Sequence, residues 1–183
     1  MFVIEHLEPK LFKWCFLEYL HISSFVGKEN LFFTNIKSEK LKKYGKVEEK
    51  SVRELHFENA CVLDPEAEET LTPEIAKKFN YFIFGGILGD DPPKLRTKVE
   101  LTKFLPYPAF NLGKAQMSTD TAVIVTKLIV DGKKLSELEF QDGVDIPIAE
   151  GEEVHLPYKY LLVGNKPLLA PGIVDMLKKQ KSF

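Results

Sequence analysis

The sequence predicts an α/β protein with a mostly parallel sheet and helices on both of its faces. Two observations carry this prediction. Short apolar runs, typical of buried strands, alternate with segments of helical spacing up to about residue 130. The chain has 183 residues, of which 44% are hydrophobic, and this suits one α/β domain with a full core. We therefore expect a single domain over residues 1–183.

Four apolar runs have the length and composition of strands that are buried on both faces. They span residues 2–4, 31–34, 60–63 and 81–84. A fifth strand is expected at the start of residues 104–110, followed by irregular chain. Pro106 and Pro108 exclude a regular central strand there, because proline cannot donate to the ladder.

Helical spacing or helix-start residues mark six further segments. We expect helices over residues 10–24, 38–44, 72–79, 95–103, 118–130 and 173–179. Pro9 is expected to open the first helix, and Gly45 to end the second as a C-cap. The start at Thr72-Pro73-Glu74 combines a capping hydroxyl, a proline at the first position and a carboxylate at the positive end. Residues 118–130 are apolar on nearly every side, so this helix should be buried.

The alternation of strands and helices stops after about residue 131. Residues 139–140, 144–148 and 154–163 then have an extended pattern, and Gly164-Asn165 suits a tight turn. We expect residues 136–183 to form an irregular β-rich extension that wraps the domain.

The charge of the chain is weak evidence for or against a nucleic-acid partner. The formal net charge is −2, which removes the simplest argument for nucleic-acid binding, an overall basic surface. One local basic stretch exists, with lysines at 37, 40, 42, 43, 46 and 50, interrupted by glutamates at 39, 48 and 49. A solvated helix and loop is the simpler interpretation. A phosphate-binding or ribosome-facing surface is the alternative.

The cysteines, the histidines and the hydropathy of the chain indicate its cellular compartment and whether a metal site is expected. Cys15 and Cys61 lie in apolar contexts and are expected to pack as reduced, small hydrophobes without a disulfide or a zinc site. The four histidines have no metal-ligand spacing, so no metal is expected. No apolar run is long enough to span a bilayer, and no secretory signal is visible. We therefore expect a cytoplasmic protein with no membrane partner.

Two glycine-marked loops are the candidates for chemistry. The first, Gly85-Gly86-Ile87-Leu88-Gly89-Asp90-Asp91, follows a buried strand, and ligands bind at the carboxyl ends of strands in open α/β sheets. It matches neither the dinucleotide fingerprint nor the P-loop. Taken alone, it is as compatible with a tight turn and capping aspartates as with a ligand site.

The second loop, residues 112–121, is polar, contains Gly113 and runs into the buried helix. By itself it is explained most simply as a helix cap. The alternative is that backbone amides at the helix start hold a polar ligand.

Read together, these loops and their neighbours carry a resemblance to a known family. The matching segments are Glu5-His6-Leu7-Glu8, Trp14 with Leu17-Glu18-Tyr19, Leu63-Asp64-Pro65, FGGILGD at 84–90 with Pro92-Pro93 and Arg96-Thr97, QMSTDTA at 116–122, Leu156-Pro157-Tyr158 and Pro171-Gly172. Over nearly its whole length the chain resembles a small branch of the SPOUT superfamily of S-adenosylmethionine-dependent methyltransferases. Ser118 stands where the family often has threonine, which keeps the hydroxyl.

The resemblance implies a deep trefoil knot at about residues 80–135, whose loops bind S-adenosylmethionine in a bent conformation. The cofactor residues that it implies are Phe84, Gly85, Gly86, Ile87, Leu88 and Gly89 from the first loop, with Leu112, Gly113, Gln116, Met117 and Thr121 from the second. Most SPOUT proteins dimerise through the knot. Because the extended tail is expected to cover that face, a monomer is expected here.

The branch includes methyltransferases that act on an arginine of a ribosomal protein, and older family labels describe RNA methyltransferases. An arginine acceptor stays charged and needs carboxylates, so Asp90 is the first catalytic candidate, followed by Glu5 and Glu18. An RNA acceptor would favour Arg96, which is otherwise expected to form a structural ion pair with Asp90 or Asp91. The net acidity favours an arginine of a ribosomal or translation-related protein. An RNA acceptor, or a cofactor-binding protein without turnover, remains as an alternative.

Overall fold

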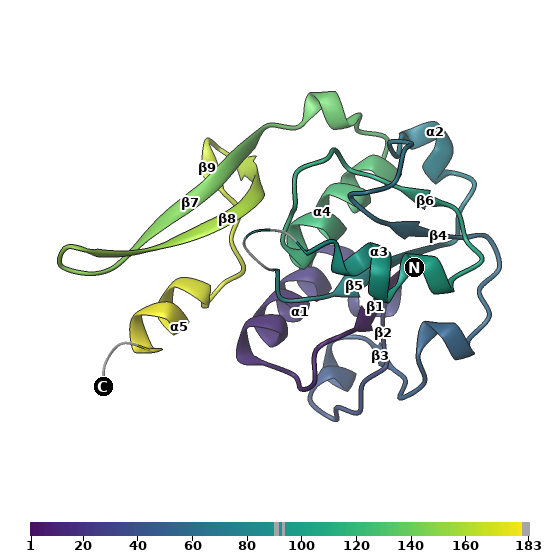
Figure 1. Ribbon diagram of the computed structural model, residues 1–183, viewed down its shortest axis with the longest axis horizontal. Helices are drawn as coiled ribbons and strands as arrows, with labels where there is room; N and C mark the ends of the chain where they lie inside the picture. The colour runs from purple at the N-terminus through teal and green to yellow at the C-terminus, as the bar shows by residue number, and fades with distance from the viewer. Residues whose placement is uncertain (90–91, 93, 181–183) are drawn as a thin grey trace.

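The computed structural model describes residues 1–89, 92 and 94–180, and its centre is a six-stranded sheet (Figure 1). The strands are β1 Phe2–His6, β2 Leu31–Thr34, β3 Lys46–Val47, β4 Ala60–Leu63, β5 Tyr81–Gly86 and β6 Ala109–Phe110. They lie in the order β3-β2-β1-β5-β4-β6, and every neighbouring pair is parallel. The four predicted apolar strands are therefore confirmed, and so is the mostly parallel sheet.

Both faces of the sheet are covered, which explains why its strands are apolar at nearly every position. Phe2 and Ile4 of β1 point to the larger core cluster, and Val3 between them points to the smaller one. Helices cover the first face, whereas the second is covered mainly by short 3-10 turns and loops. The expectation of helices on both faces is thus only partly met.

The helices of this region are α1 Lys13–Val26, α2 Pro73–Ala76, α3 Arg96–Glu100 and α4 Thr119–Val130. Short 3-10 turns lie at η1 Lys28–Asn30, η2 Leu41–Lys43, η3 Val52–Glu54, η4 Thr102–Phe104 and η5 Leu135–Glu137. The first helix begins at Lys13 with Phe12 as its N-cap, so Pro9 lies before it and does not open it. Thr72 does cap α2, since its hydroxyl accepts from the backbone N–H of Ile75 at 3.3 Å.

Three predicted helices are much shorter in the structure, and of the helix expected over 72–79 only α2 Pro73–Ala76 forms. The polar segment 38–44 forms only the turn η2, in which Leu41 is the one buried residue, and so little buried apolar surface does not hold a longer helix. Gly45 is not a left-handed cap. A Cβ there would lie 2.7 Å from the carbonyl oxygen of Leu31, so glycine is needed for close packing on β2. Segment 95–103 likewise divides into α3 and η4.

The strand near the two prolines lies after them, not before them as we expected. β6 pairs only with β4 and is the edge of the sheet. Pro108 still contributes a bond, because its carbonyl accepts from the N–H of Val62 at 2.9 Å. Proline at a sheet edge is tolerated on the acceptor side alone, which explains the position of this strand.

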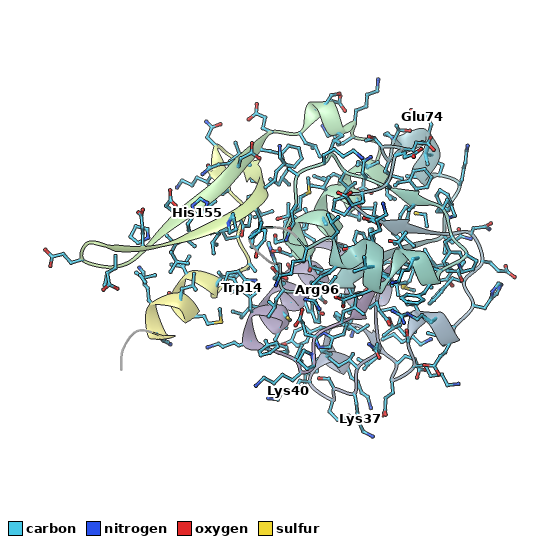
Figure 2. The ribbon with its side chains drawn as sticks, in the orientation of Figure 1. Trp14, Lys37, Lys40, Glu74, Arg96 and His155 are labelled. Atoms are coloured by element: carbon cyan, nitrogen blue, oxygen red, sulfur yellow. The ribbon has the colours of Figure 1, made fainter. Side chains whose placement is uncertain are left out.

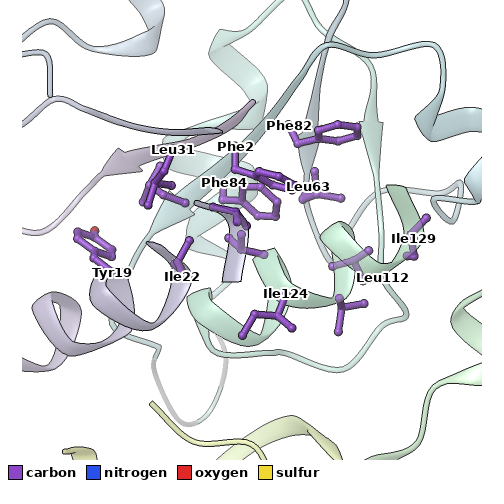
Figure 3. Packing of buried hydrophobic residues seen from close by; sticks show 14 of the residues in the cluster. Phe2, Tyr19, Ile22, Leu31, Leu63, Phe82, Phe84, Leu112, Ile124 and Ile129 are labelled. Carbon is purple, nitrogen blue, oxygen red and sulfur yellow. The ribbon is translucent and has the colours of Figure 1, made fainter. Parts of the chain in front are cut away.

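Helix α4 is buried as predicted and packs beside α1 against the sheet (Figure 3). Ile124 and Ile129 are nearly or fully inaccessible and belong to the same cluster as Phe84 and Leu112. This packing fixes the start of α4 close to the carboxyl ends of the central strands.

The C-terminal extension is a hairpin and a helix: β7 Phe140–Ala149, β8 Glu152–Val163, β9 Lys166–Pro167 and α5 Ile173–Gln180. The predicted tight turn is confirmed, with positive φ at both Gly164 and Asn165. The hairpin and α5 share a small core of their own, to which Trp14 and Leu17 of α1 add. The expected β-rich extension is confirmed, and the β7–β8 pairing has two register irregularities. The hairpin projects from the body (Figure 1), so the expectation that the tail wraps the domain is wrong. Two long strands that pair with each other and pack on α5 bury their apolar faces without wrapping the sheet.

Cys15 and Cys61 are buried and free, as predicted. Among the described helices, none is long and apolar enough to cross a membrane.

The packing of α4 predicts a sharp difference between two adjacent residues. Ile129 is 0% exposed and Val130 is 38% exposed. Truncating Ile129 to alanine should lower the free energy of unfolding by about 2–5 kcal/mol, because it leaves a cavity in the main core. Val130→Ala, the control, should change it by less than about 0.5 kcal/mol. Urea denaturation of both variants measures this, and equal effects would contradict the burial of α4.

Candidate active site

A cavity opens where β4 and β5 end, at the carboxyl edge of the parallel sheet. Ligands of open α/β sheets bind at this edge. The cavity is lined by Leu63, Asp64, Pro65, Glu66, Phe84, Gly85, Ile87, Gly89, Lys94, Leu95, Arg96, Thr97, Leu112, Gly113, Lys114, Ala115, Gln116, Met117, Thr119 and Ala122. The two predicted loops, which are well separated in sequence, therefore meet around one cavity.

Most of the predicted cofactor residues line this cavity. They are Phe84, Gly85, Ile87, Gly89, Leu112, Gly113, Gln116 and Met117. Three predicted residues lie behind the lining. Gly86 packs against Tyr19, Leu88 donates its N–H to the Glu8 carboxylate at 2.9 Å, and the Thr121 hydroxyl accepts from Ser118 at 2.8 Å. These three residues shape the loops from outside the cavity.

Space at Gly89 favours glycine. A Cβ there would lie 2.5 Å from a ring carbon of Tyr158, so a larger residue would displace the ring or the loop. A Cβ on Gly85 would lie 2.8 Å from the end of the Ile87 side chain, which can shift.

A buried amide side chain holds the second loop. The Asn111 side-chain oxygen accepts from the N–H of Gly113 and from the Thr70 hydroxyl, both at 2.9 Å. Its amide nitrogen donates to the carbonyl of Ala67 at 2.8 Å, and the Lys114 ammonium donates to the same carbonyl at 2.7 Å. Gly113 adopts φ of +91°, a conformation that favours glycine. The loop is therefore fixed before any ligand arrives.

The C-terminal hairpin ties the two loops to each other. The backbone N–H of Lys159 donates to the carbonyl of Gln116 at 2.8 Å, which joins β8 to the second loop. The Tyr158 hydroxyl donates to the carbonyl of Gly89 at 2.9 Å, which joins β8 to the first loop. The hairpin thus holds both loops in place from outside the cavity lining.

Two buried carboxylates face each other where α1 meets the start of α4. Glu18 is 5% exposed and accepts from the indole N–H of Trp14 at 2.9 Å. Asp120 is 2% exposed and lies 2.7 Å from Nδ1 of His21. Thr119, which lines the cavity, hydrogen-bonds Glu18 and so connects the pair to the cavity.

The surroundings of Glu18 change its proton affinity. Burial raises the pKa of Glu18 well above its ordinary value, and the negative charge of Asp120 raises it further. The hydrogen bonds from Trp14 and Thr119 oppose this shift in the pKa. Burial also raises the pKa of Tyr160, which feels both carboxylates. A cation placed between the two carboxylates would relieve this repulsion.

Glu5, a predicted catalytic residue, lies away from the cavity. Its carboxylate accepts from the Thr34 hydroxyl at 2.6 Å, the Ser51 hydroxyl at 2.5 Å and the N–H of Val52 at 3.1 Å. These bonds join β1 and β2 to η3, and the residue is 1% exposed. Glu5 therefore has a structural role between these elements, and it does not line the cavity.

Arg96 lines the cavity, but its ion pairs hold neighbouring segments of the chain together. Its guanidinium donates to Glu8 at 2.7 Å and to Glu100 at 2.7 and 3.2 Å. These bonds, Glu100 first, raise the pKa of Arg96 further above its already high value. Because Glu8 also accepts from Leu88, the arginine holds α3 against the first loop. The expected partners were Asp90 or Asp91, and the observed partners are Glu8 and Glu100.

Asp90, the first catalytic candidate, and Asp91 lie outside the described residues. Within the residues that are described, no group of three or more His, Cys, Asp or Glu is placed to hold a metal ion. Of the histidines in the matching segments, His6 hydrogen-bonds the Tyr19 hydroxyl at 2.8 Å, and His21 bonds Asp120.

Comparison with known proteins decides the family. Residues 1–182 match the family model described as "Protein arginine N-methyltransferase SFM1-like". The chain belongs to this family. It is 35% identical to protein arginine N-methyltransferase SFM1 of Saccharomyces cerevisiae over 204 aligned positions, which cover 99% of this chain and 95% of the yeast protein. The expected resemblance and the expected class of enzyme, an S-adenosylmethionine-dependent methyltransferase, are therefore confirmed.

Solved structures agree with this assignment. The crystal structure of yeast SFM1 complexed with SAM has a TM-score of 0.90 at 36% identity, covering 100% of this chain and 91% of the other. The complex of yeast SFM1 with SAH has a TM-score of 0.88 at 35% identity, covering 97% and 94% of the two chains. A dual-specific Trm10 from Thermococcus kodakaraensis is similar in fold, with a TM-score of 0.53 at 20% identity over 74% of this chain and 95% of that one.

Sequence reasoning missed several residues of the site. Asp120 was considered only as a helix cap, yet it forms the acidic pair with Glu18. Asp64 lines the cavity and accepts from the Thr102 hydroxyl at 2.6 Å. Both lie inside segments that matched the family, Leu63-Asp64-Pro65 and QMSTDTA at 116–122, and that membership was the available signal.

Because Arg96 forms ion pairs with Glu8 and Glu100, replacing it should measurably lower the stability of the protein. Arg96→Gln should lower the free energy of unfolding by about 1–3 kcal/mol, because it leaves the nearly buried Glu8 carboxylate without its charged partner. The control, Lys127→Gln, breaks an exposed pair with Asp131 and should cost less than about 1 kcal/mol. Denaturant titrations compare the two variants. A loss of activity without any loss of stability in Arg96→Gln would contradict this structural role and favour the catalytic role first expected.

Proposed function

We propose that this protein transfers a methyl group from S-adenosylmethionine to a guanidinium nitrogen of a protein arginine. The observation that carries this proposal is the buried pair Glu18 and Asp120, which lies next to Thr119 on the wall of the cavity. Two buried carboxylates close together repel each other even with hydrogen-bond donors in place, and a cation is the ligand that compensates this repulsion. Family membership supports the same reaction.

The cavity suits S-adenosylmethionine in its shape and in its chemistry. Its apolar side chains, among them Leu63, Phe84 and Leu112, match an adenine ring. The glycine-rich stretches let backbone N–H and C=O groups approach a polar ligand closely. Asp64 and Glu66 at the same wall offer carboxylates for hydroxyl or ammonium groups. The bound cofactor supplies the electrophilic methyl group on its sulfonium.

The acidic pair suits an arginine acceptor. A guanidinium stays charged at any relevant pH and presents planar N–H donors, which two carboxylates bind in fixed directions. Trp14 orients Glu18, and His21 with Ser118 orients Asp120. Held in this way, the two carboxylates would aim one guanidinium nitrogen toward the cavity, and such alignment supplies much of the rate of a displacement.

The raised pKa of Glu18 gives it a second task. Methylation of a guanidinium nitrogen releases one proton, and a carboxylate with a raised pKa accepts it more readily than an ordinary one. Glu18 is therefore the residue that we propose as the base, with Asp120 as the partner that holds the cation.

Four finer features belong to this proposal. We propose an acceptor in a ribosomal or translation-related protein, a cytoplasmic location and a monomer. The fourth feature is a trefoil knot at about residues 80–135. The resemblance to SPOUT proteins supports the knot, and the packing of the C-terminal hairpin on both loops supports a single-chain site.

Replacing Glu18 with glutamine tests the proposal. The glutamine oxygen can still accept from Trp14, but the charge is lost, so kcat/KM for an arginine-containing protein should fall about 100-fold or more. The control Glu58→Gln alters an exposed carboxylate far from the cavity and should have no effect. Transfer of labelled methyl to purified ribosomes and to their separated protein and RNA fractions measures the activity. Label in the RNA fraction alone would contradict an arginine acceptor.

The same variant should change the pH dependence of stability. A carboxyl whose folded-state pKa is raised stabilises the protein while it is protonated, and that contribution disappears as pH rises through the folded-state pKa. Glu18→Gln should therefore unfold at a higher temperature than the wild type at pH 8, and the difference should shrink toward pH 4. A variant that is less stable than the wild type at every pH would argue against a strained acidic pair.

The hydrogen bond from Tyr158 to the carbonyl of Gly89 should support cofactor binding. Tyr158→Phe removes the hydroxyl that fixes the first loop, and S-adenosylmethionine should bind about tenfold more weakly. Tyr81→Phe also removes a hydroxyl, from β5 at the far side of the core, and should leave affinity unchanged. Isothermal titration calorimetry compares the two variants, and equal affinities would show that the hairpin does not hold the loop.

A further inference from the structure

A cluster of exposed lysines lies at the β3 edge of the sheet. We call this surface the basic edge, and it consists of Lys37, Lys40, Lys42, Lys43, Lys46 and Lys50. All six side chains belong to exposed residues, and Figure 2 shows Lys37 and Lys40 on one rim of the molecule. Three glutamates share this stretch of sequence, in a chain whose net charge is −2. The basic edge is therefore a positive surface on an otherwise acidic protein.

The backbone that carries these lysines is fixed. The N–H of Asn35 donates to the carbonyl of Lys50 at 3.0 Å, and the N–H of Ile36 donates to the carbonyl of Glu48 at 3.2 Å. The Ser23 hydroxyl of α1 donates to the carbonyl of Tyr44 at 2.7 Å. The lysines are thus presented from a firm base, which lowers the entropy lost when a partner binds.

Half of the basic edge is uncompensated. Lys37 and Lys42 form exposed ion pairs with Glu49 and Glu39, which are worth little, and Lys46 lies 4.3 Å above the Phe32 ring. Throughout the described part of the chain, no carboxylate lies within ion-pair distance of Lys40, Lys43 or Lys50. These three ammonium groups are available to an anion.

The basic edge lies next to the proposed acceptor site. Helix α1 separates the two surfaces. On one side, Phe16 contacts the Tyr44 ring with 6.0 Å between centroids, and on the other side Glu18 meets Asp120. A helix with its side chains is about 10 Å across. One large partner can therefore reach both surfaces.

We propose that the basic edge binds the phosphate backbone of RNA in a ribonucleoprotein substrate. Within this segment Leu41 is fully buried, and Tyr44 and Val47 are half-buried and pack against the core, so the edge lacks the exposed apolar anchors of a protein interface or of a membrane-binding helix. Spaced lysines without such anchors suit a phosphate chain. The link to methyl transfer rests on the proposed arginine acceptor, whereas RNA binding itself does not. In this view, arginines that lie beside RNA are the preferred acceptors.

RNA binding is tested first, in the absence of any cofactor or acceptor. The variant Lys40→Gln/Lys43→Gln/Lys50→Gln removes the three free cations. A matched control, Lys77→Gln/Lys78→Gln/Lys133→Gln, removes three exposed lysines elsewhere. With a fluorescent 20-nucleotide single-stranded RNA, fluorescence anisotropy should show affinity for the wild type and the control that falls steeply with salt. The basic-edge variant should bind about tenfold more weakly, with a salt slope lower by about 2.

Methyl transfer is tested separately, with free acceptor protein and with purified ribosomal subunits. The basic-edge variant should raise KM for the subunits by about tenfold, leave kcat unchanged and methylate free protein as the wild type does. Absence of RNA binding by the wild type, or equal weakening in both triple variants, would overturn the proposal. Binding to phosphatidylserine vesicles but not to RNA would overturn it as well. Failure to methylate any arginine would instead contradict the proposed function, even where RNA binding follows the expected pattern.

Discussion

The contact between α1 and α4 holds the functional part of this protein together. It brings Glu18 of the first helix against Asp120 at the start of the fourth, and the 2.7 Å contact between His21 and Asp120 joins positions 99 residues apart. Apolar packing of both helices on the sheet sets the distance between them. Two buried carboxylates repel each other, so this geometry exists only because the surrounding core and the donors on each side outweigh the repulsion. The acidic pair is therefore a cost that the fold carries for a purpose.

The sheet was predictable because its signal is local. Four strands that are buried on both faces must be continuously apolar, and no other element of this chain has that pattern. The helices were predicted less well, because their length depends on what they cover. Segment 38–44 has helical residues but buries little more than Leu41, and it shortens to a single turn. The hairpin after residue 140 was seen only as extended pieces, because pairing between β7 and β8 depends on partners that a single sequence does not reveal.

The features of the site also differ in how well the sequence predicts them. The cavity loops were predictable from glycines at strand ends, where close approach favours glycine, as at Gly89. The roles of individual carboxylates were not predictable from the sequence. Glu5 and Glu18 are both buried acids in matching segments, and only their partners separate them. Glu5 is saturated by three donors, while Glu18 faces another carboxylate. The folded structure alone decides whether a buried acid has its hydrogen bonds filled or is destabilised by a neighbouring carboxylate.

The strained pair also bears on how a product leaves. An arginine that has gained a methyl group keeps its positive charge but has one N–H fewer, and it can no longer make the full set of paired hydrogen bonds. Between Glu18 and Asp120, with oxygens already shared with Trp14 and His21, there is little else for that nitrogen to meet. The modified side chain is therefore held less firmly than the unmodified one. In the site that we propose, this would favour one turnover at each arginine followed by release, so the acids proposed to select the acceptor would also limit how far it is modified.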